Sequence, residues 1–155
     1  MSKNNPLYIL KRRKDKGHDI FNFGGIYYGD LKNNKAHGKG ILILKNGHQY
    51  MGQWENNKMH GKGILFSPEG DKYIGEFKNN MMCGIGIKIF SDGTYYIGQH
   101  KNNMFNGRGI LTCSDGTRDI GTWKDSLMHG DITIQYDDGF VLETSFKNGE
   151  EIENV

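Results

Sequence analysis

Three histidines at regular spacing are the first side chains in this 155-residue chain that could do chemistry. His37, His60 and His129 occupy one position of a 23-residue period, and Cys83 and Asn106 occupy it in the two units between. Histidine and cysteine could bind zinc, but if each unit is a hairpin, equivalent positions lie two strands apart, about 9–10 Å. Zinc lies only about 2.0–2.3 Å from each ligand. We therefore predict no metal site and interpret these residues as turn residues that bond to loop backbone.

Pairs of glycines separated by one residue, such as Gly61 and Gly63, could suggest a phosphate-binding loop. Such a loop needs a strand before it and a helix N-terminus after it, because the helix amides hold the phosphate. Strand-like residues follow these glycines instead. No serine or cysteine lies in a nucleophile motif, and no carboxylate pair recurs. We therefore predict that the protein is not an enzyme and has no cofactor.

The two ends of the chain carry opposite charges. Residues 1–22 hold six basic and two acidic side chains, whereas residues 137–155 hold six acidic and one basic. The basic cluster Lys11, Arg12, Arg13 and Lys14 could bind anionic lipid headgroups or an acidic protein tail, or it could be a solvated arm. Opposite charges also permit end-to-end association, which screening by salt would weaken.

A 23-residue period organises the chain from about residue 16 to residue 149. Glycine recurs at this spacing in four columns, of which one is Gly29, Gly52, Gly75, Gly98 and Gly121. In the second full unit, Tyr50, Gly52 and Trp54 share one face of an expected strand because side chains alternate with period two. The pattern favours short strands, which also suits 23 glycines and only 35% hydrophobic residues.

Turn residues divide each unit into two strands. Asn56 and Asn57 follow the first expected strand, and a second expected strand over residues 61–66 ends at Pro68 and Gly70. Other units have Asn-Gly or Asp-Gly at this place, which is the strongest short-range hairpin signal. The sequence therefore predicts an all-β fold in which hairpins follow one another in one antiparallel meander.

Glycine at the centre of a strand needs a reason, because it costs about 0.5–1 kcal/mol relative to alanine. We expect each central glycine to leave a gap over which a neighbouring ring lies flat. A single sheet would then gain half a core without a second layer.

An aromatic face and a methionine-rich edge are the predicted partner-binding surfaces, because one layer cannot bury both of its faces. The residues expected on the face are Tyr27, Tyr50, Trp54, Tyr73, Phe77, Tyr96 and Trp123. Those expected on the edge are Met59, Met82, Phe105 and Met128. The alternative is that these side chains only pack on their own sheet.

The iterated tyrosine–X–glycine and glycine–X–glycine motifs resemble the MORN (membrane occupation and recognition nexus) repeat family over most of the chain, from Gly29 to Gly139. The departures are Asp119 for tyrosine, His100 for the aromatic residue, Ile132 for glycine, and Asn-Asn for the usual Asn-Gly turn. The resemblance implies an elongated, twisted, single-layer antiparallel sheet of β-hairpins. It also implies a scaffold at membranes or cytoskeletal structures such as cilia, with phosphoinositides or peptides as ligands in some members.

The expected organisation is a basic arm over residues 1–15, the repeat array over 16–149 and an acidic tail over 150–155. Cys83 and Cys113 lie at non-equivalent repeat positions, which favours a reducing compartment. No apolar stretch is long enough for a signal peptide or a membrane span. We therefore expect a cytoplasmic protein, at the cytoskeleton or cilium if the resemblance holds.

Three functions compete at this point. The first is a non-enzymatic scaffold that docks a partner protein, without nucleic acid or a small-molecule substrate. The second is a peripheral adaptor that binds phosphoinositides or other anionic lipids through basic residues. The third is a regulatory fragment of an enzyme whose catalytic domain is a separate chain.

Overall fold

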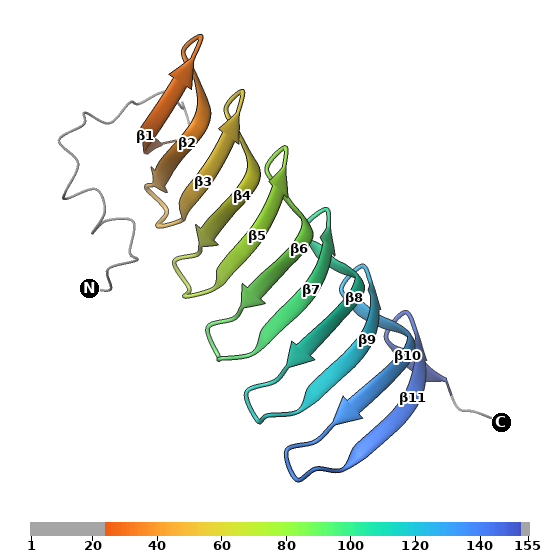
Figure 1. Cartoon of the computed structure of the whole chain (residues 1–155). Coiled ribbons are helices and arrows are strands. Elements are labelled where there is room, and N and C mark those ends of the chain that lie inside the picture. The colour runs from red at the N-terminus through yellow and green to blue at the C-terminus, as the bar shows by residue number, and fades with distance from the viewer. Residues whose placement is uncertain (1–23, 153–155) are drawn as a thin grey trace.

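Twelve strands form one open antiparallel sheet in the computed structural model, which describes residues 24–152. The sheet order equals the chain order, so each strand pairs only with the strands before and after it (Figure 1). The strands are β1 (Gly25–Lys32), β2 (Lys35–Leu44), β3 (Gln49–Glu55), β4 (Lys58–Phe66), β5 (Lys72–Lys78), β6 (Met81–Ile89), β7 (Tyr95–Lys101), β8 (Met104–Thr112), β9 (Arg118–Lys124), β10 (Leu127–Gln135), β11 (Val141–Lys147) and β12 (Glu150–Ile152). The predicted all-β meander of hairpins is confirmed.

The expected basic arm, with Lys11, Arg12, Arg13 and Lys14, lies outside the described residues, as do residues 16–23 at the start of the expected repeat array. At the other end, β12 begins at Glu150, where the sequence placed the start of an acidic tail. The described residues contain no helix that could cross a membrane.

Each Asn-Asn pair forms a two-residue turn, and the pairs that end at Asn57, Asn80 and Asn103 also tie their repeat to the previous one. Asn56 and Asn57 have φ angles of 50° and 66°, a left-handed conformation that asparagine tolerates and that matches the twist of the strands. The Asn57 amide donates to the carbonyl of Ala36 at 3.0 Å, and the Asn57 Oδ1 accepts from the Ala36 amide at 2.6 Å. A glycine in place of Asn57 could make only the first of these bonds.

A row of nine glycines crosses the middle of the sheet. Successive pairing joins Gly29, Gly40, Gly52, Gly63, Gly75, Gly86, Gly98, Gly109 and Gly121. A Cβ on Gly63 would lie 2.6 Å from Cζ of Tyr50, so this ring lies directly on the glycine backbone. The Tyr50 hydroxyl donates to the carbonyl of Gln53 at 2.9 Å, and Tyr27, Tyr73 and Tyr96 make the same bond three residues ahead. The expectation that the glycines seat aromatic rings is confirmed.

Edge-to-face ring contacts make these tyrosines into a continuous core. Trp54 lies between Tyr27 and Tyr50, with ring centroids 5.3 and 5.1 Å away, and its Nε1 donates to the carbonyl of Gly40 at 3.2 Å. Phe77 fills the same place between Tyr50 and Tyr73. Burial raises the pKa of Tyr27 to about 12, which reflects how completely one layer encloses the ring.

The fifth unit keeps its packing with a different pair of residues. Asp119 stands where the other units have tyrosine, and Ile132 stands in the glycine row. A Cβ on Gly121 would lie 2.5 Å from Cδ1 of Ile132, so the isoleucine covers the glycine that a tyrosine ring would otherwise cover. Ile132 is 1% exposed. The two departures from the repeat therefore compensate for each other, because Ile132 fills the space that the missing tyrosine at position 119 would occupy.

Candidate docking surface

The aromatic rings that were expected to face a partner are buried. Their exposed fractions lie between 0 and 5%, in the set Tyr27, Tyr50, Trp54, Tyr73, Phe77, Tyr96 and Trp123. The glycine row lets each tyrosine lie flat on the backbone. Leucines such as Leu42 and Leu65 pair with the tyrosines of the neighbouring strands, and we call this second row of paired residues the tyrosine row. The expected exposed aromatic stripe is therefore a closed half-core, and a partner on this face would contact its covering side chains.

The methionine column forms part of that cover. Met59, Met82, Phe105 and Met128 are all half-buried. Met59 and Met82 pack against the core, and the Phe105 ring stacks on Tyr96 with centroids 3.8 Å apart. A hollow of about 370 Å³ lies above Tyr50. Met59 lines this hollow and occupies the repeat position that Phe105 occupies two repeats later.

The histidine column does not converge on a metal site. Across residues 24–152, no group of three or more His, Cys, Asp or Glu side chains could hold a metal ion. His129 Nδ1 accepts a bond from the backbone amide of Asn148 at 3.3 Å, in the next turn. Burial and the nearby Glu76 carboxylate raise the pKa of the Cys83 thiol, which disfavours the thiolate that a nucleophile needs.

The opposite face carries a second row of apolar side chains that the sequence analysis missed. Successive pairing joins Tyr28, Ile41, Met51, Ile64, Ile74, Ile87, Ile97, Ile110 and Ile120. We call these nine residues the isoleucine row and their side of the sheet the isoleucine face. Most of the row is half-exposed, and Ile97 is 42% exposed. The signal was present in the sequence, because these residues directly follow the tyrosine or the second glycine of each unit.

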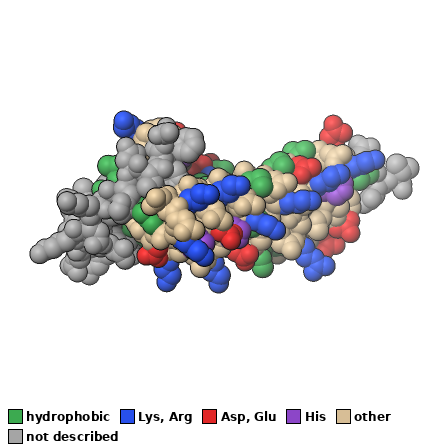
Figure 2. Space-filling view, turned by 90° about the horizontal axis from the view of Figure 1, so that it is seen from above, with side chains coloured by type: hydrophobic (Ala, Val, Ile, Leu, Met, Phe, Trp, Pro, Cys, Tyr) green, Lys and Arg blue, Asp and Glu red, His purple; other side chains and the backbone are tan. Residues whose placement is uncertain are grey.

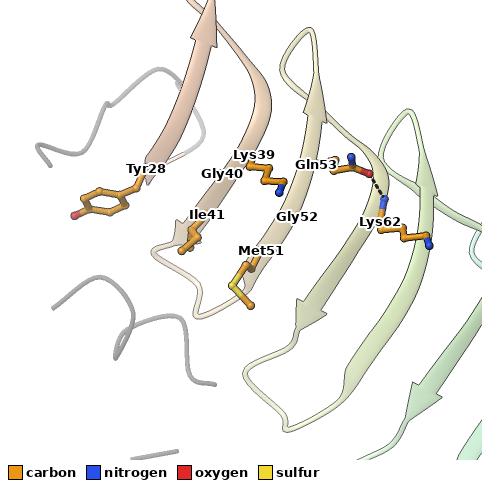
Figure 3. Close-up of a pocket in the computed structure, with 8 residues that line it drawn as sticks. All are labelled: Tyr28, Lys39, Gly40, Ile41, Met51, Gly52, Gln53 and Lys62. Carbon is orange, nitrogen blue, oxygen red and sulfur yellow. Dashed lines mark hydrogen bonds between the residues drawn. The ribbon is translucent and has the colours of Figure 1, made fainter. Parts of the chain in front are cut away.

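A groove runs beside the isoleucine row over the first strands. Two adjoining hollows of about 440 and 540 Å³ share Met51 and Lys62. Figure 3 shows Ile41 and Met51 on one side of the glycine row, and Lys39, Gln53 and Lys62 on the other. The floor is the backbone of the glycine row, because any side chain at these positions would point to the aromatic face.

A β-bulge shapes the polar wall of this groove. At the bulge in β4, Gly61 has a φ of 59°, a conformation that glycine adopts without strain. Gln53 Oε1 closes the bulge by accepting a bond from the Lys62 amide at 2.7 Å. Asp30 does the same for Lys39, at 2.9 Å. Because their backbone amides are held in this way, the Lys39 and Lys62 side chains extend into solvent.

Lysines border the isoleucine face along the edge of the Asn-Asn turns. Figure 2 shows Lys and Arg side chains along much of the length of this edge. The exposed lysines beside the turns are Lys32, Lys35, Lys58, Lys78, Lys101, Lys124 and Lys147. The charge changes along the strip, because Asp131, Glu143 and Glu150 follow in β10 to β12. The lysines of this edge thus continue as far as β11, and acidic side chains join them only from β10 to β12.

Two polar side chains interrupt the aromatic core in the third and fourth units. His100 is 4% exposed and lies between Tyr73 and Tyr96, with ring centroids 4.9 and 5.2 Å away. Its Nδ1 is 3.1 Å from the carbonyl of Gly98, and its Nε2 has no hydrogen-bond partner within the described part of the chain. Lys88 takes a leucine position in the tyrosine row, and its Nζ lies 3.0 Å from Asp71 Oδ2.

His100 should make the protein sensitive to acid. Burial and, to a smaller extent, the charge of Lys88 lower the pKa of His100 in the folded state. Because the unfolded state then binds the proton more readily, the free energy of unfolding should fall as the pH drops below about 6.5. Replacing His100 with phenylalanine should remove this fall. Urea unfolding at pH 7.5 and 5.5 measures it, and an equal pH dependence in both proteins would contradict the assignment.

The meander and its buried tyrosines place this protein in the class of open single-layer β-repeat proteins. The MORN repeat model matches residues 27–49, 50–72, 73–95, 96–118 and 120–130, which together make up more than half of the sequence. The chain therefore belongs to the MORN repeat family, a non-enzymatic repeat type that mediates protein or lipid interactions.

No curated protein matches the chain with significant similarity. Among solved structures, the chain is similar to the SAS-4 (dCPAP) TCP domain of Drosophila melanogaster, determined in complex with a proline-rich motif of Ana2 (dSTIL). The identity is 11%, the match covers 83% of this chain and 88% of the other, and the TM-score is 0.27.

Proposed function

We propose that this protein is a non-enzymatic scaffold that docks a partner protein on its isoleucine face within a larger assembly. The observation that carries the proposal is the isoleucine row, which continues across nine strands and has no second layer of this chain over it among the described residues. Contiguous apolar surface of this kind marks interaction sites in soluble proteins.

The buried aromatic core supports the docking surface from behind. Because the rings fill one face, the sheet keeps its shape without a second layer, and no element within residues 24–152 covers the other face. The half-buried Met59, Met82, Phe105 and Met128 offer a smaller secondary contact on the aromatic side. We place the assembly at the cytoskeleton or a cilium, the expectation that follows from the family.

The alternative function is a peripheral adaptor that binds phosphoinositides or other anionic lipids. The lysines along the turn edge favour it, together with the basic cluster at residues 11–14. End-to-end association of copies is a further proposal from the charges of the two ends, and a monomeric mass at low salt would reject it.

Proximity labelling in the native cell tests the scaffold function. We expect the double substitution Ile74→Ser with Ile97→Ser to lose most of the labelled partners, because it removes two apolar contacts without changing the charge. Leu31→Ser is the control, since Leu31 is 38% exposed but lies on the aromatic face, in alternation with Tyr27 and Gly29. A labelling pattern that is the same for the wild type and the double variant, with both folded, would reject the isoleucine face as the docking site.

A further inference from the structure

We infer that the groove over β1 to β6 binds an acidic segment of a partner chain whose aliphatic side chains enter between the isoleucine row and the lysines. This inference rests on the proposed function and specifies the chemistry of the partner. The two hollows provide the site, and the charges around them select the ligand.

The two walls of the groove are complementary to two different kinds of side chain in one ligand. One wall is apolar, and its half-exposed Met51 and Ile64 gain free energy when aliphatic groups displace their water, whereas Ile41 is only 6% exposed. The other wall presents the exposed ammonium groups of Lys39 and Lys62. A ligand that contacts both walls carries aliphatic and acidic groups close together.

Positive charge prevails around this part of the groove. Fewer acidic groups lie nearby: the Asp30 carboxylate holds the Lys39 amide, Glu55 Oε2 lies 3.4 Å from His60 Nδ1, and the exposed Glu76 lines the second hollow. Within residues 24–152, no salt bridge engages the lysines at the adjoining turns, which are Lys32, Lys35, Lys58 and Lys78. Charge complementarity therefore favours an acidic partner.

The chain's own N-terminal region fits this groove poorly, because Lys11, Arg12, Arg13 and Lys14 would meet like charges. A flat bilayer also fits poorly, since the apolar wall stands beside a floor of recessed glycine backbone that headgroups would have to enter. A peptide can follow the recess and the twist of the sheet. A protein segment is therefore the occupant that the shape and the charge favour together.

The spacing of the lysines sets the spacing of the acidic groups. Lys39 and Lys62 belong to successive repeats and so lie two strands apart, about 9–10 Å. A segment in the polyproline II conformation advances about 3.1 Å per residue with about three residues per turn, so every third side chain meets a lysine. The groove crosses β1 to β6 and is about 24 Å long at the strand spacing, which accommodates about seven or eight extended residues.

A synthetic peptide with the sequence Glu-Leu-Ser repeated three times is the probe. Fluorescence anisotropy with the full chain should show saturable binding that weakens with salt, and the peptide with glutamine for glutamate should bind at least about tenfold more weakly. The double substitution Lys39→Gln with Lys62→Gln should weaken binding of the acidic peptide about tenfold. Lys101→Gln with Lys124→Gln is the matched control, because it removes two exposed lysines beyond the groove and should change binding less than about twofold.

Two results would overturn the inference. One is equal binding of the glutamate and glutamine peptides, or no binding of either. The other is preferential binding to vesicles of phosphatidylcholine with phosphatidylserine, lost in the Lys39→Gln and Lys62→Gln variant, which would make the groove a membrane contact. If the peptide fails but labelled partners are still lost in the Ile74→Ser and Ile97→Ser variant, the scaffold function stands and only the acidic chemistry is rejected.

Discussion

Replacing Gly63 with valine should destabilise the protein by about 3 kcal/mol, the upper part of the usual range for overpacking. The new Cβ would lie 2.6 Å from Cζ of Tyr50, and the ring cannot move away because Trp54 and Phe77 hold both of its sides. The ring must therefore leave the core or the strand must shift. Thermal or urea unfolding measures the loss.

Lys62→Val is the matched control for this substitution. It places the same side chain one residue earlier in β4, at an exposed position, so we expect a change within about 0.5 kcal/mol. Gly86→Val should repeat the effect of Gly63→Val, since its Cβ would lie 2.6 Å from Cζ of Tyr73. Unfolding transitions at the wild-type midpoint for both glycine variants would refute the packing of rings on the glycine row.

The second large effect should appear when the fifth unit is converted to the pattern of the others. Asp119→Tyr alone should destabilise the protein because Ile132 covers Gly121, where the ring would have to lie. Ile132→Gly alone should cost about 2–5 kcal/mol because it empties a buried position. The double variant should be at least as stable as the wild type, since it also removes a buried carboxyl group whose pKa is raised by burial.

A double-mutant cycle measures this compensation, and we expect a coupling energy of about 2–3 kcal/mol between residues 119 and 132. Ile132→Gly combined with Leu42→Ala provides the control pair. Leu42 lies in β2, which pairs with neither β10 nor any neighbour of β10, so the two destabilising effects should add. Additive effects of the Asp119 and Ile132 substitutions would show that the two departures are independent.

The sequence was sufficient for the fold because its signals are local and repeated. Asn-Asn and Asp-Gly turns fix where each strand ends, and alternation places tyrosine and glycine on one face. The exposure of the rings was not predictable from alternation, because it depends on how deeply each ring lies on the glycine row. A ring such as Tyr50 reaches over two neighbouring strands and is covered by leucines from the strands on either side.

The docking surface was missed for a different reason. The residue after each tyrosine and the residue after each second glycine already form apolar columns in the sequence, as Ile74 and Ile64 show. Their union into one row follows only when pairing is known, since the bulges shift the register between adjacent strands. The ion pair between Lys88 in β6 and Asp71, which directly precedes β5, likewise could not be read from either residue alone.

The two hydrogen bonds between Asn57 and Ala36 have a mechanical consequence. They join adjoining units, and no strand of the described sheet pairs with one farther away. Tension applied at the two ends would therefore pass through every unit in series, and the strip would peel open from a terminal strand. For the same reason, units could be added or removed in the middle at a nearly constant change in stability per unit, as expected of a one-dimensional array.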